Sequence, residues 1–281
     1  MTTFTYHQLD VFSDRPLMGN PLAVVHDADA LTTEDMARFA RWTNLSETTF
    51  VLPPTDPRAD YRVRIFTPGQ ELPFAGHPTL GTCWAWLNAG GVPAQDGIVV
   101  QECGIGLVTV RVEGQQLAFA APPLLRSGPL DEPLVQRIAL ALGVDRADIL
   151  HHQWVVNGPE FCAVMLPSAE QVRALRPNFA ALAYVKLGVI GPQAKGAPTD
   201  FEVRGFVVPS GVNEDPVTGS LNAAMAQWLI GAGLAPARYV ASQGTVLGRA
   251  GRVHVAQDPQ SAGTIWIGGA SVTCIEGKAW L

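Results

Sequence analysis

The sequence predicts a mixed α/β (α+β) fold of two similar halves, each with a mixed sheet curled around one central helix. The first observation is an internal echo: residues 61–68 read YRVRIFTP and residues 201–209 read FEVRGFVVP, displaced by 140 positions (61 to 201). Each echoed segment leads through a glycine-containing loop into an apolar helix ending in Trp-Leu, at Trp86 and Trp228. Since 47% of the 281 residues are hydrophobic, the chain can bury two cores of ordinary size.

The individual elements follow from local pattern. Residues 101–112 and 243–255 alternate β-branched residues after a glycine turn, which indicates a strand in each half. Residues 79–87 are apolar on nearly all sides, so this helix must be buried on most faces. Shorter amphipathic helices are predicted at 32–43, with an acidic first turn, and at 132–142, where Pro133 suits a helix start. The proline-rich stretch 121–133 predicts a linker, so we place the halves at 1–124 and 125–281, with the last strand able to pack on the first half.

Composition narrows the class of protein. A net charge of -6 and scattered Lys and Arg argue against nucleic acid as a partner. The most apolar stretch, 221–235, is interrupted by polar residues and glycine, so no membrane segment is predicted. The four cysteines form no regular framework and the N-terminus is polar, which is typical of a reducing compartment. We therefore expect a cytoplasmic protein.

The two loop-to-helix junctions are where chemistry is expected. Glycine loops lead into Thr79 and Ser220, and the unpaired N–H groups at a helix start form a seat for a carboxylate. This predicts an acidic small-molecule ligand. The alternative is that Thr79 and Ser220 only cap their helices, which is the commoner role of these residue types.

Other candidates cannot be selected by residue type alone. His77 lies beside the first junction and could move a proton, but a loop histidine is more often structural. Glu214 and Asp215 lie at the second junction, where acidic residues also simply favour the helix dipole. Glu47 lies in a polar turn, where a glutamate is usually exposed to solvent and has no catalytic role. His151 and His152 lack neighbouring ligands at metal spacing, so we expect no metal.

Four separated segments together resemble the phenazine-biosynthesis-like (PhzF) isomerase family. They are residues 10–25 (DVFSDRPLMGNPLAVV), 45–50 (LSETTF), 71–79 (ELPFAGHPT) and 214–220 (EDPVTGS). The matches run in the family's order, so the resemblance covers essentially the whole chain. It implies the diaminopimelate-epimerase-like fold, with an active site in the cleft between two similar domains.

The same resemblance implies the roles of individual residues. Glu47 corresponds to the acid/base, and His77, Asp215 and Ser220 complete the catalytic set. Ser46, Gly76 and Gly219 are the expected substrate-binding residues. The implied activity is a cofactor-independent isomerisation of a small carboxylate, similar to that of trans-2,3-dihydro-3-hydroxyanthranilate isomerase, and a homodimer is plausible by the same likeness.

Two alternatives stay open. Related racemases and epimerases use two cysteines, one at each junction, but here those places hold Ala75 and Pro216. A racemase or epimerase would therefore need Glu47 with another acid in place of thiols. The second alternative is a non-catalytic protein that binds a small acid.

Overall fold

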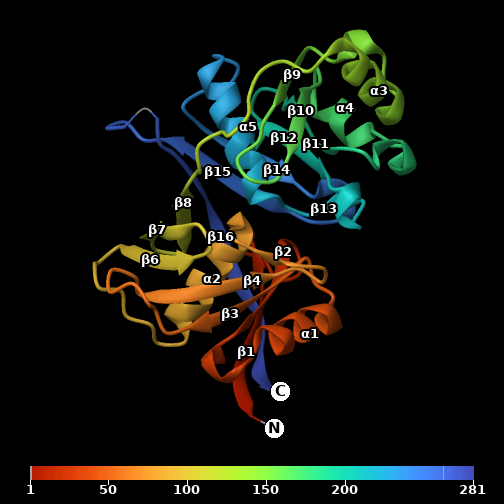
Figure 1. Ribbon diagram of the computed structural model, residues 1–281. Coiled ribbons are helices and arrows are strands. Elements are labelled where there is room, and N and C mark those ends of the chain that lie inside the picture. The colour runs from red at the N-terminus through yellow and green to blue at the C-terminus, as the bar shows by residue number, and fades with distance from the viewer. Residues whose placement is uncertain (1, 262) are drawn as a thin grey trace. The chain divides into compact units, whose positions relative to one another are not determined.

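The computed structural model describes residues 2–261 and 263–281 and divides into two compact units (Figure 1). The first unit holds the chain up to Ala120 together with Gly268–Leu281, and the second holds Ala121–Ile267. The C-terminal strand thus contributes to the first unit. The predicted division into halves at 1–124 and 125–281 stays a prediction.

The first unit is a closed ring of strands. Its sheet runs in the order β1-β2-β3-β4-β6-β7-β8-β16, and β16 also pairs antiparallel with β1, which closes the ring. The short β5 pairs with β4 outside this path. The bounds are β1 (Thr3–Val11), β2 (Asn20–Val25), β3 (Glu47–Leu52), β4 (Tyr61–Phe66), β5 (Glu71–Leu72), β6 (Ile98–Cys103), β7 (Gly106–Glu113), β8 (Gln116–Ala120) and β16 (Ile265–Trp280).

Helix α2 (Gly76–Asn88) is the central helix of this ring. It contacts β1, β2, β3, β6 and β8, and most of its residues are buried. At Gly81 a Cβ atom would lie 2.6 Å from Leu22 and 2.7 Å from Val11, so only glycine allows the helix this close to the strands. The predicted buried helix inside a curled sheet is confirmed, although it begins at Gly76 and not at Thr79.

Helix α1 (Thr33–Thr43) covers the outer face of the same unit, as the pattern at 32–43 predicts. Thr32 and Asp35 form a reciprocal capping box at its start. Met36, Phe39 and Ala40 then face a cluster that includes Phe50 and Phe66. The ring pairs Phe39–Phe50 and Phe50–Phe66 meet edge to face, the arrangement that aromatic quadrupoles favour.

The second unit carries a mixed sheet in the order β15-β14-β12-β11-β10-β9, with β13 paired to β12. Its strands are β9 (His151–Trp154), β10 (Phe161–Met165), β11 (Lys186–Pro192), β12 (Phe201–Phe206), β13 (Glu214–Asp215), β14 (Arg238–Gln243) and β15 (Gly251–Gln257). Its helices are α3 (Glu132–Leu142), α4 (Ala169–Ala174) and α5 (Gly219–Gly231). Among the residues described, no helix of either unit is long and apolar enough to cross a membrane.

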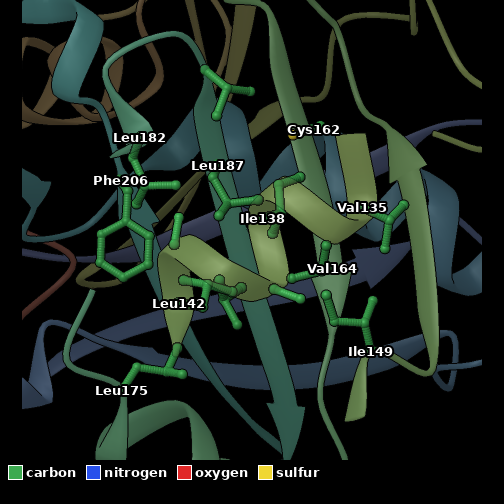
Figure 2. Close-up of a cluster of buried hydrophobic side chains, with 14 of the residues drawn as sticks. Val135, Ile138, Leu142, Ile149, Cys162, Val164, Leu175, Leu182, Leu187 and Phe206 are labelled. Carbon is green, nitrogen blue, oxygen red and sulfur yellow. The ribbon is translucent and has the colours of Figure 1, made fainter. Parts of the chain in front are cut away.

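One hydrophobic core cluster of the second unit lies between α3 and the strands β10 and β11. Val135, Ile138 and Leu142 of α3 point toward Val164 and Leu187, as Figure 2 shows. The helix starts where the sequence predicts, because Asp131 caps it by accepting from the Leu134 N–H and Pro133 occupies its first turn.

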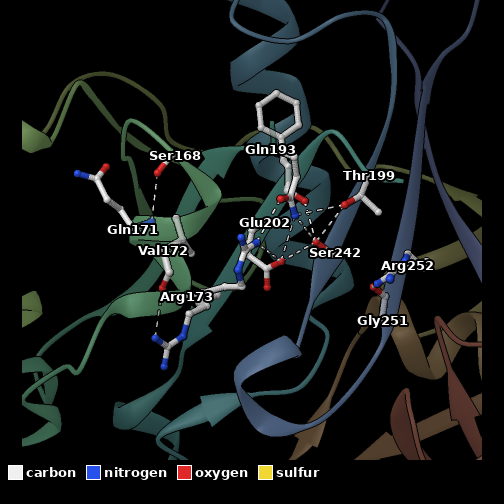
Figure 3. Close-up of polar contacts among 12 residues, drawn as sticks. Ser168, Gln171, Val172, Arg173, Gln193, Thr199, Glu202, Ser242, Gly251 and Arg252 are labelled. Atoms are coloured by element: carbon white, nitrogen blue, oxygen red, sulfur yellow. Dashed lines mark hydrogen bonds and ion pairs between the residues drawn. The ribbon is translucent and has the colours of Figure 1, made fainter. Parts of the chain in front are cut away.

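A buried carboxylate ties several elements of this unit together (Figure 3). Glu202 of β12 is 1% exposed, and its Oε2 accepts from Ser242 Oγ at 2.7 Å and Gln193 Nε2 at 3.4 Å. Arg173 Nη1 of α4 lies 3.6 Å from the same oxygen. Because a buried charge is tolerated only when it is paired and hydrogen-bonded, this network joins β12, β14, the end of β11 and α4.

In both units an aspartate directly before a strand makes the same pair of backbone hydrogen bonds. Asp60 accepts from the Val100 N–H at 2.6 Å, and its own N–H donates to the Val100 carbonyl at 2.8 Å. Asp200 makes the same two bonds with Val240, both at 2.8 Å. Each pair joins neighbouring parallel strands at equivalent places, which supports the duplication inferred from the echo.

The arginine of the echoed Val-Arg-x-Phe motif is repeated in the same way. Arg64 donates through Nε and Nη2 to Glu71, at 2.7 Å each. Arg204 donates through the same atoms to Glu214, at 2.9 and 2.7 Å. The first pair is partly exposed, whereas the second is almost completely buried. Each pair fastens a short strand, β5 or β13, beside the loop that leads into a central helix.

Candidate functional site

Glu47 and His77 meet in the first unit. Glu47 is the first residue of β3, and His77 is the second residue of α2. His77 Nε2 lies 3.4 Å from Glu47 Oε2, with the histidine side chain 5% exposed and the glutamate side chain 16% exposed. The carboxylate therefore keeps access to solvent while the imidazole behind it is enclosed.

Burial makes His77 a neutral ring. Desolvation lowers its pKa to about 3, and a hydrogen bond with the Pro21 backbone opposes this only in part. At neutral pH the imidazole is thus uncharged and can exchange a hydrogen bond with a carboxyl group, but it cannot serve as a resident cation beside Glu47.

The start of α2 has no side-chain cap. Its N-cap residue is Ala75, and Gly76 follows as the first helical residue. Thr79 does not cap the helix as the alternative expectation held, because its hydroxyl donates back to the Ala75 carbonyl from inside the first turn. Gly76 and the following first-turn positions therefore form the kind of helix start at which carboxylates bind.

The second unit has an equivalent junction at the start of α5. Thr218 is the N-cap residue and again makes no side-chain cap, and Gly219 and Ser220 are the first two helical residues. Asp215 precedes them in β13, and Thr218 Oγ1 donates to Asp215 Oδ2 at 2.6 Å. Asp215, Gly219 and Ser220 thus occupy one junction, as expected, and Ser220 lies within the helix and not at its cap.

A buried glutamine organises that junction. Gln243 Oε1 accepts from the Thr218 N–H at 3.0 Å and from Asn222 Nδ2 at 2.8 Å. Its Nε2 donates to Thr218 Oγ1 at 3.0 Å and to the Asp215 carbonyl at 3.2 Å. Three of these contacts hold Thr218 and Asp215 before α5, and the fourth is with Asn222 inside the helix, so the backbone position of Asp215 depends on a side chain of β14.

The first unit repeats this glutamine. Gln101 donates to Thr79 Oγ1 at 3.1 Å and accepts from the Tyr61 hydroxyl at 3.0 Å. Gln101 lies within β6 and Gln243 ends β14, the strands that follow α2 and α5 in the sequence. The two glutamines stand at matching places of the internal repeat, and this was the sequence signal that could have pointed to them. The sequence does not reveal which side chains they contact.

The remaining sequence candidates have simpler surroundings. Ser46 lies directly before β3 and is half-buried beside Glu47. Glu214 is used in the ion pair with Arg204, so it is not a second acid of the junction. Sequence reasoning missed Asn20, whose buried amide Nδ2 lies 3.4 Å from His77 Nδ1. It belongs to a matched segment, but the contact joins residues 57 positions apart.

Thiol chemistry finds no support at the junctions. Ala75 and Pro216 stand where a two-cysteine enzyme would hold its thiols. Burial raises the pKa of the Cys83 thiol inside α2 and raises that of Cys162 to about 12, so neither supplies a thiolate at neutral pH. Within residues 2–261 and 263–281, no three His, Cys, Asp or Glu side chains are grouped so that they could hold a metal ion.

Comparison with known proteins gives the family. A family model described as phenazine biosynthesis-like protein (PhzC-PhzF) matches residues 9–277. The trans-2,3-dihydro-3-hydroxyanthranilate isomerase of Pseudomonas aeruginosa is 34% identical over 98% of this chain and 99% of its own. Antisense-enhancing sequence 1 of Schizosaccharomyces pombe is 36% identical over the full length of both.

The fold comparison agrees. The crystal structure of the Bacillus anthracis phenazine biosynthesis protein, of the PhzF family, aligns over 100% of both chains with a TM-score of 0.85 and 25% identity. This confirms the expected fold class. Because the family model spans nearly the whole chain and relatives exceed 30% identity over its full length, the protein belongs to the phenazine biosynthesis-like (PhzF) family and is an isomerase.

Proposed function

We propose that the protein moves a proton within a small carboxylated substrate, without a cofactor, and that Glu47 is its acid/base. The observation that carries this proposal is the 3.4 Å contact between Glu47 Oε2 and the buried, neutral His77. A carboxyl group that is partly exposed and lies beside a neutral imidazole can take up a proton and return it. One such group is sufficient for moving a double bond or a keto-enol hydrogen.

The substrate carboxylate is proposed to bind at an uncapped helix start. Gly76 and Gly219 begin α2 and α5, and neither helix has a side-chain cap. Backbone N–H groups at such positions stabilise an anion without adding a titrating group near Glu47. In this account Ser46 and Ser220 contact substrate, and Asp215 assists in the proton transfer.

The first substrate to test is taken from the names of the relatives. Several relatives are named trans-2,3-dihydro-3-hydroxyanthranilate isomerase, so this compound is the first substrate to test. Incubation in deuterated buffer followed by proton NMR separates the candidates. Deuterium that appears with migration of the double bond supports the isomerase, whereas deuterium at an unmoved stereocentre supports a racemase or epimerase.

Three further expectations belong to the proposal. A single carboxyl group supplies both proton steps, so activity is expected to survive dialysis against a chelator. A homodimer is expected and is tested by analytical ultracentrifugation. A small carboxylate is the only ligand proposed for this reaction, and the cytoplasm is the proposed location.

A further inference from the structure

A second pocket lies in the first unit, at the C-terminal end of α2. Its volume is about 600 Å³, which is in the range of small-molecule sites. Asn88, the last residue of α2, and the following residues 89–91 form one side of it. His77 lies near the opposite end of the same helix, about 17 Å away at the rise of an α-helix. The pocket is therefore separate from the contact between Glu47 and His77.

Two buried histidines line this pocket. His7 of β1 is 5% exposed and His26, directly after β2, is 4% exposed. His7 Nδ1 lies 2.8 Å from His26 Nε2, so one ring donates a hydrogen bond to the other. The remaining nitrogens, His7 Nε2 and His26 Nδ1, make no hydrogen bond within residues 2–261 and 263–281. Because buried polar groups normally have hydrogen-bond partners, a partner from outside the protein is expected at this pair.

The histidine pair has the same hydrogen-bonding capacity whichever ring donates. If His7 donates, its Nε2 has a lone pair and His26 Nδ1 carries a hydrogen; if His26 donates, the two roles are exchanged. With both rings neutral, the pair thus has one free donor and one free acceptor. Desolvation, to which the charge of His7 adds, lowers the pKa of His26 to about 4, so His26 brings no positive charge at neutral pH.

The carboxylates around the pair make the pocket electronegative. Asp27, Asp60 and Glu276 line it, and no lysine or arginine does so among the residues described. Glu276 of β16 is the cross-strand neighbour of His7. Asp27 and Glu276 are exposed and form no hydrogen bond or ion pair with another described side chain, whereas Asp60 accepts from two backbone N–H groups. Since the C-terminal end of α2 adds negative partial charge, the pocket favours a positively charged ligand.

The apolar walls of the pocket are rigid. Pro53 and Pro54, which follow β3, have fixed backbone φ angles. Tyr61 and Trp86 stack with their ring centroids 5.3 Å apart. A Cβ atom on Gly91 would overlap the Trp86 indole, so only glycine lets the loop after α2 pack this closely on the ring. These walls suit the carbon skeleton of an organic ligand.

We propose that this pocket is a second binding site, which takes the ammonium or amidinium group of a small organic cation. The N–H groups of the cation donate to the carboxylates of Asp27 and Glu276 and to the free acceptor of the histidine pair, and its apolar part lies against Trp86. An organic cation is favoured over a metal ion because no three His, Cys, Asp or Glu side chains of the described chain are grouped to hold a metal. Binding here is independent of the proposed function.

Benzylammonium is the probe for this site, and benzoate is its oppositely charged control. Ring signals of the full chain labelled at histidine are followed by ¹H–¹⁵N NMR near neutral pH, and His26→Gln identifies the signals of the pair. We expect saturable shifts of the His7 and His26 signals with benzylammonium, weakened by added salt, and no shifts with benzoate. The absence of saturable shifts with benzylammonium, or equal binding of benzoate, would overturn the proposal.

Three exposed positions provide the variants. Asp27→Asn and Glu276→Gln should each weaken benzylammonium binding roughly two- to five-fold, and the double variant roughly ten-fold, the scale of exposed ion pairs. Asparagine tolerates the left-handed backbone of Asp27, whose φ is 53°. Glu113→Gln changes an exposed glutamate of β7 outside the pocket and should leave Kd unchanged. A double variant that binds benzylammonium as tightly as the wild type would contradict the proposal, whereas loss of isomerase activity would not bear on it.

Discussion

The two arginine–glutamate pairs provide a stability test within one molecule. Arg64–Glu71 and Arg204–Glu214 have the same two-bond geometry, and each guanidinium lies about 5 Å from the ring of the phenylalanine two residues on. The side chains of the first pair are 25% and 39% exposed, and those of the second are 4% and 5% exposed. The change to make is Arg204→Met, with Arg64→Met as the matched control.

The expected magnitudes differ because the environments differ. Removing Arg204 leaves the Glu214 carboxylate buried without its partner, which costs about 3–5 kcal/mol of unfolding free energy. Arg204 Nη1 also donates to the Leu175 carbonyl at 2.9 Å, and losing this bond places the cost toward the upper end. Arg64→Met should cost only about 0–1 kcal/mol, because water can solvate Glu71.

Urea unfolding followed by circular dichroism measures both losses. If the two units unfold in separate steps, hydrogen exchange of the amides in β12 reports the second unit alone. The double variant Arg204→Met with Glu214→Met should recover about 2 kcal/mol or more, because it removes the unpaired buried charge. Equal losses for the two single variants, or no recovery in the double variant, would refute the reasoning.

Three further perturbations follow from packing, titration and hydrogen bonding. Gly81→Ala should cost about 1–3 kcal/mol, because the new Cβ overlaps three side chains, whereas Gly231→Ala, with nothing within 4 Å, should be neutral; thermal unfolding compares them. Burial lowers the pKa of His26 to about 4, and the charge of His7 adds to this effect; burial also lowers the pKa of His77 to about 3. Between pH 6.5 and these folded-state pKa values, the two imidazoles are therefore protonated in the unfolded chain but not in the folded protein. As the pH falls from roughly 6 to the folded-state pKa, each histidine should therefore lower the free energy of unfolding by about 1.4 kcal/mol per pH unit. Urea titrations at several pH values measure this slope, and His26→Gln should make it shallower. An unchanged slope would contradict the lowered pKa of His26. Gln243→Met should cost about 2–3 kcal/mol by leaving the Thr218 N–H and the Asn222 amide without their acceptor, and an unchanged melting temperature would show that water replaces it.

Local signals account for the parts of the fold that the sequence predicts well. The amphipathic runs at 32–43 and 132–142 predict helices because an acidic first turn and Pro133 mark their starts, and the structure adds Thr32 and Asp131 as the N-cap residues. The start of α2 was placed too late because Gly76 and Pro78 are typical of a loop, although proline is tolerated in the first helical turn. The echo around Arg64 and Arg204 predicted the duplication, because repeated residues occupy repeated contacts.

The residues of the candidate site could not be predicted from their neighbours in the sequence. Glu47 was selected only through a family resemblance, since nothing in its own neighbourhood separates it from an idle surface carboxylate. Its contact with His77 arises because β3 and the start of α2 are brought together by the closed sheet. Asn20 and Gln243 were missed for the same reason, because each acts on a residue that is distant in sequence.

Proton transfer by Glu47 is tested most directly by the wild-type protein and two variants in deuterated buffer with trans-2,3-dihydro-3-hydroxyanthranilate, followed by proton NMR. Glu47→Gln keeps the size and polarity of the side chain, and Glu34→Gln changes an exposed glutamate of α1 as a matched control. We predict isomerisation with deuterium uptake in the wild type and in Glu34→Gln, and a loss of about 100-fold or more in Glu47→Gln with substrate binding retained. A Glu47→Gln variant that isomerises the substrate at the wild-type rate would contradict the account.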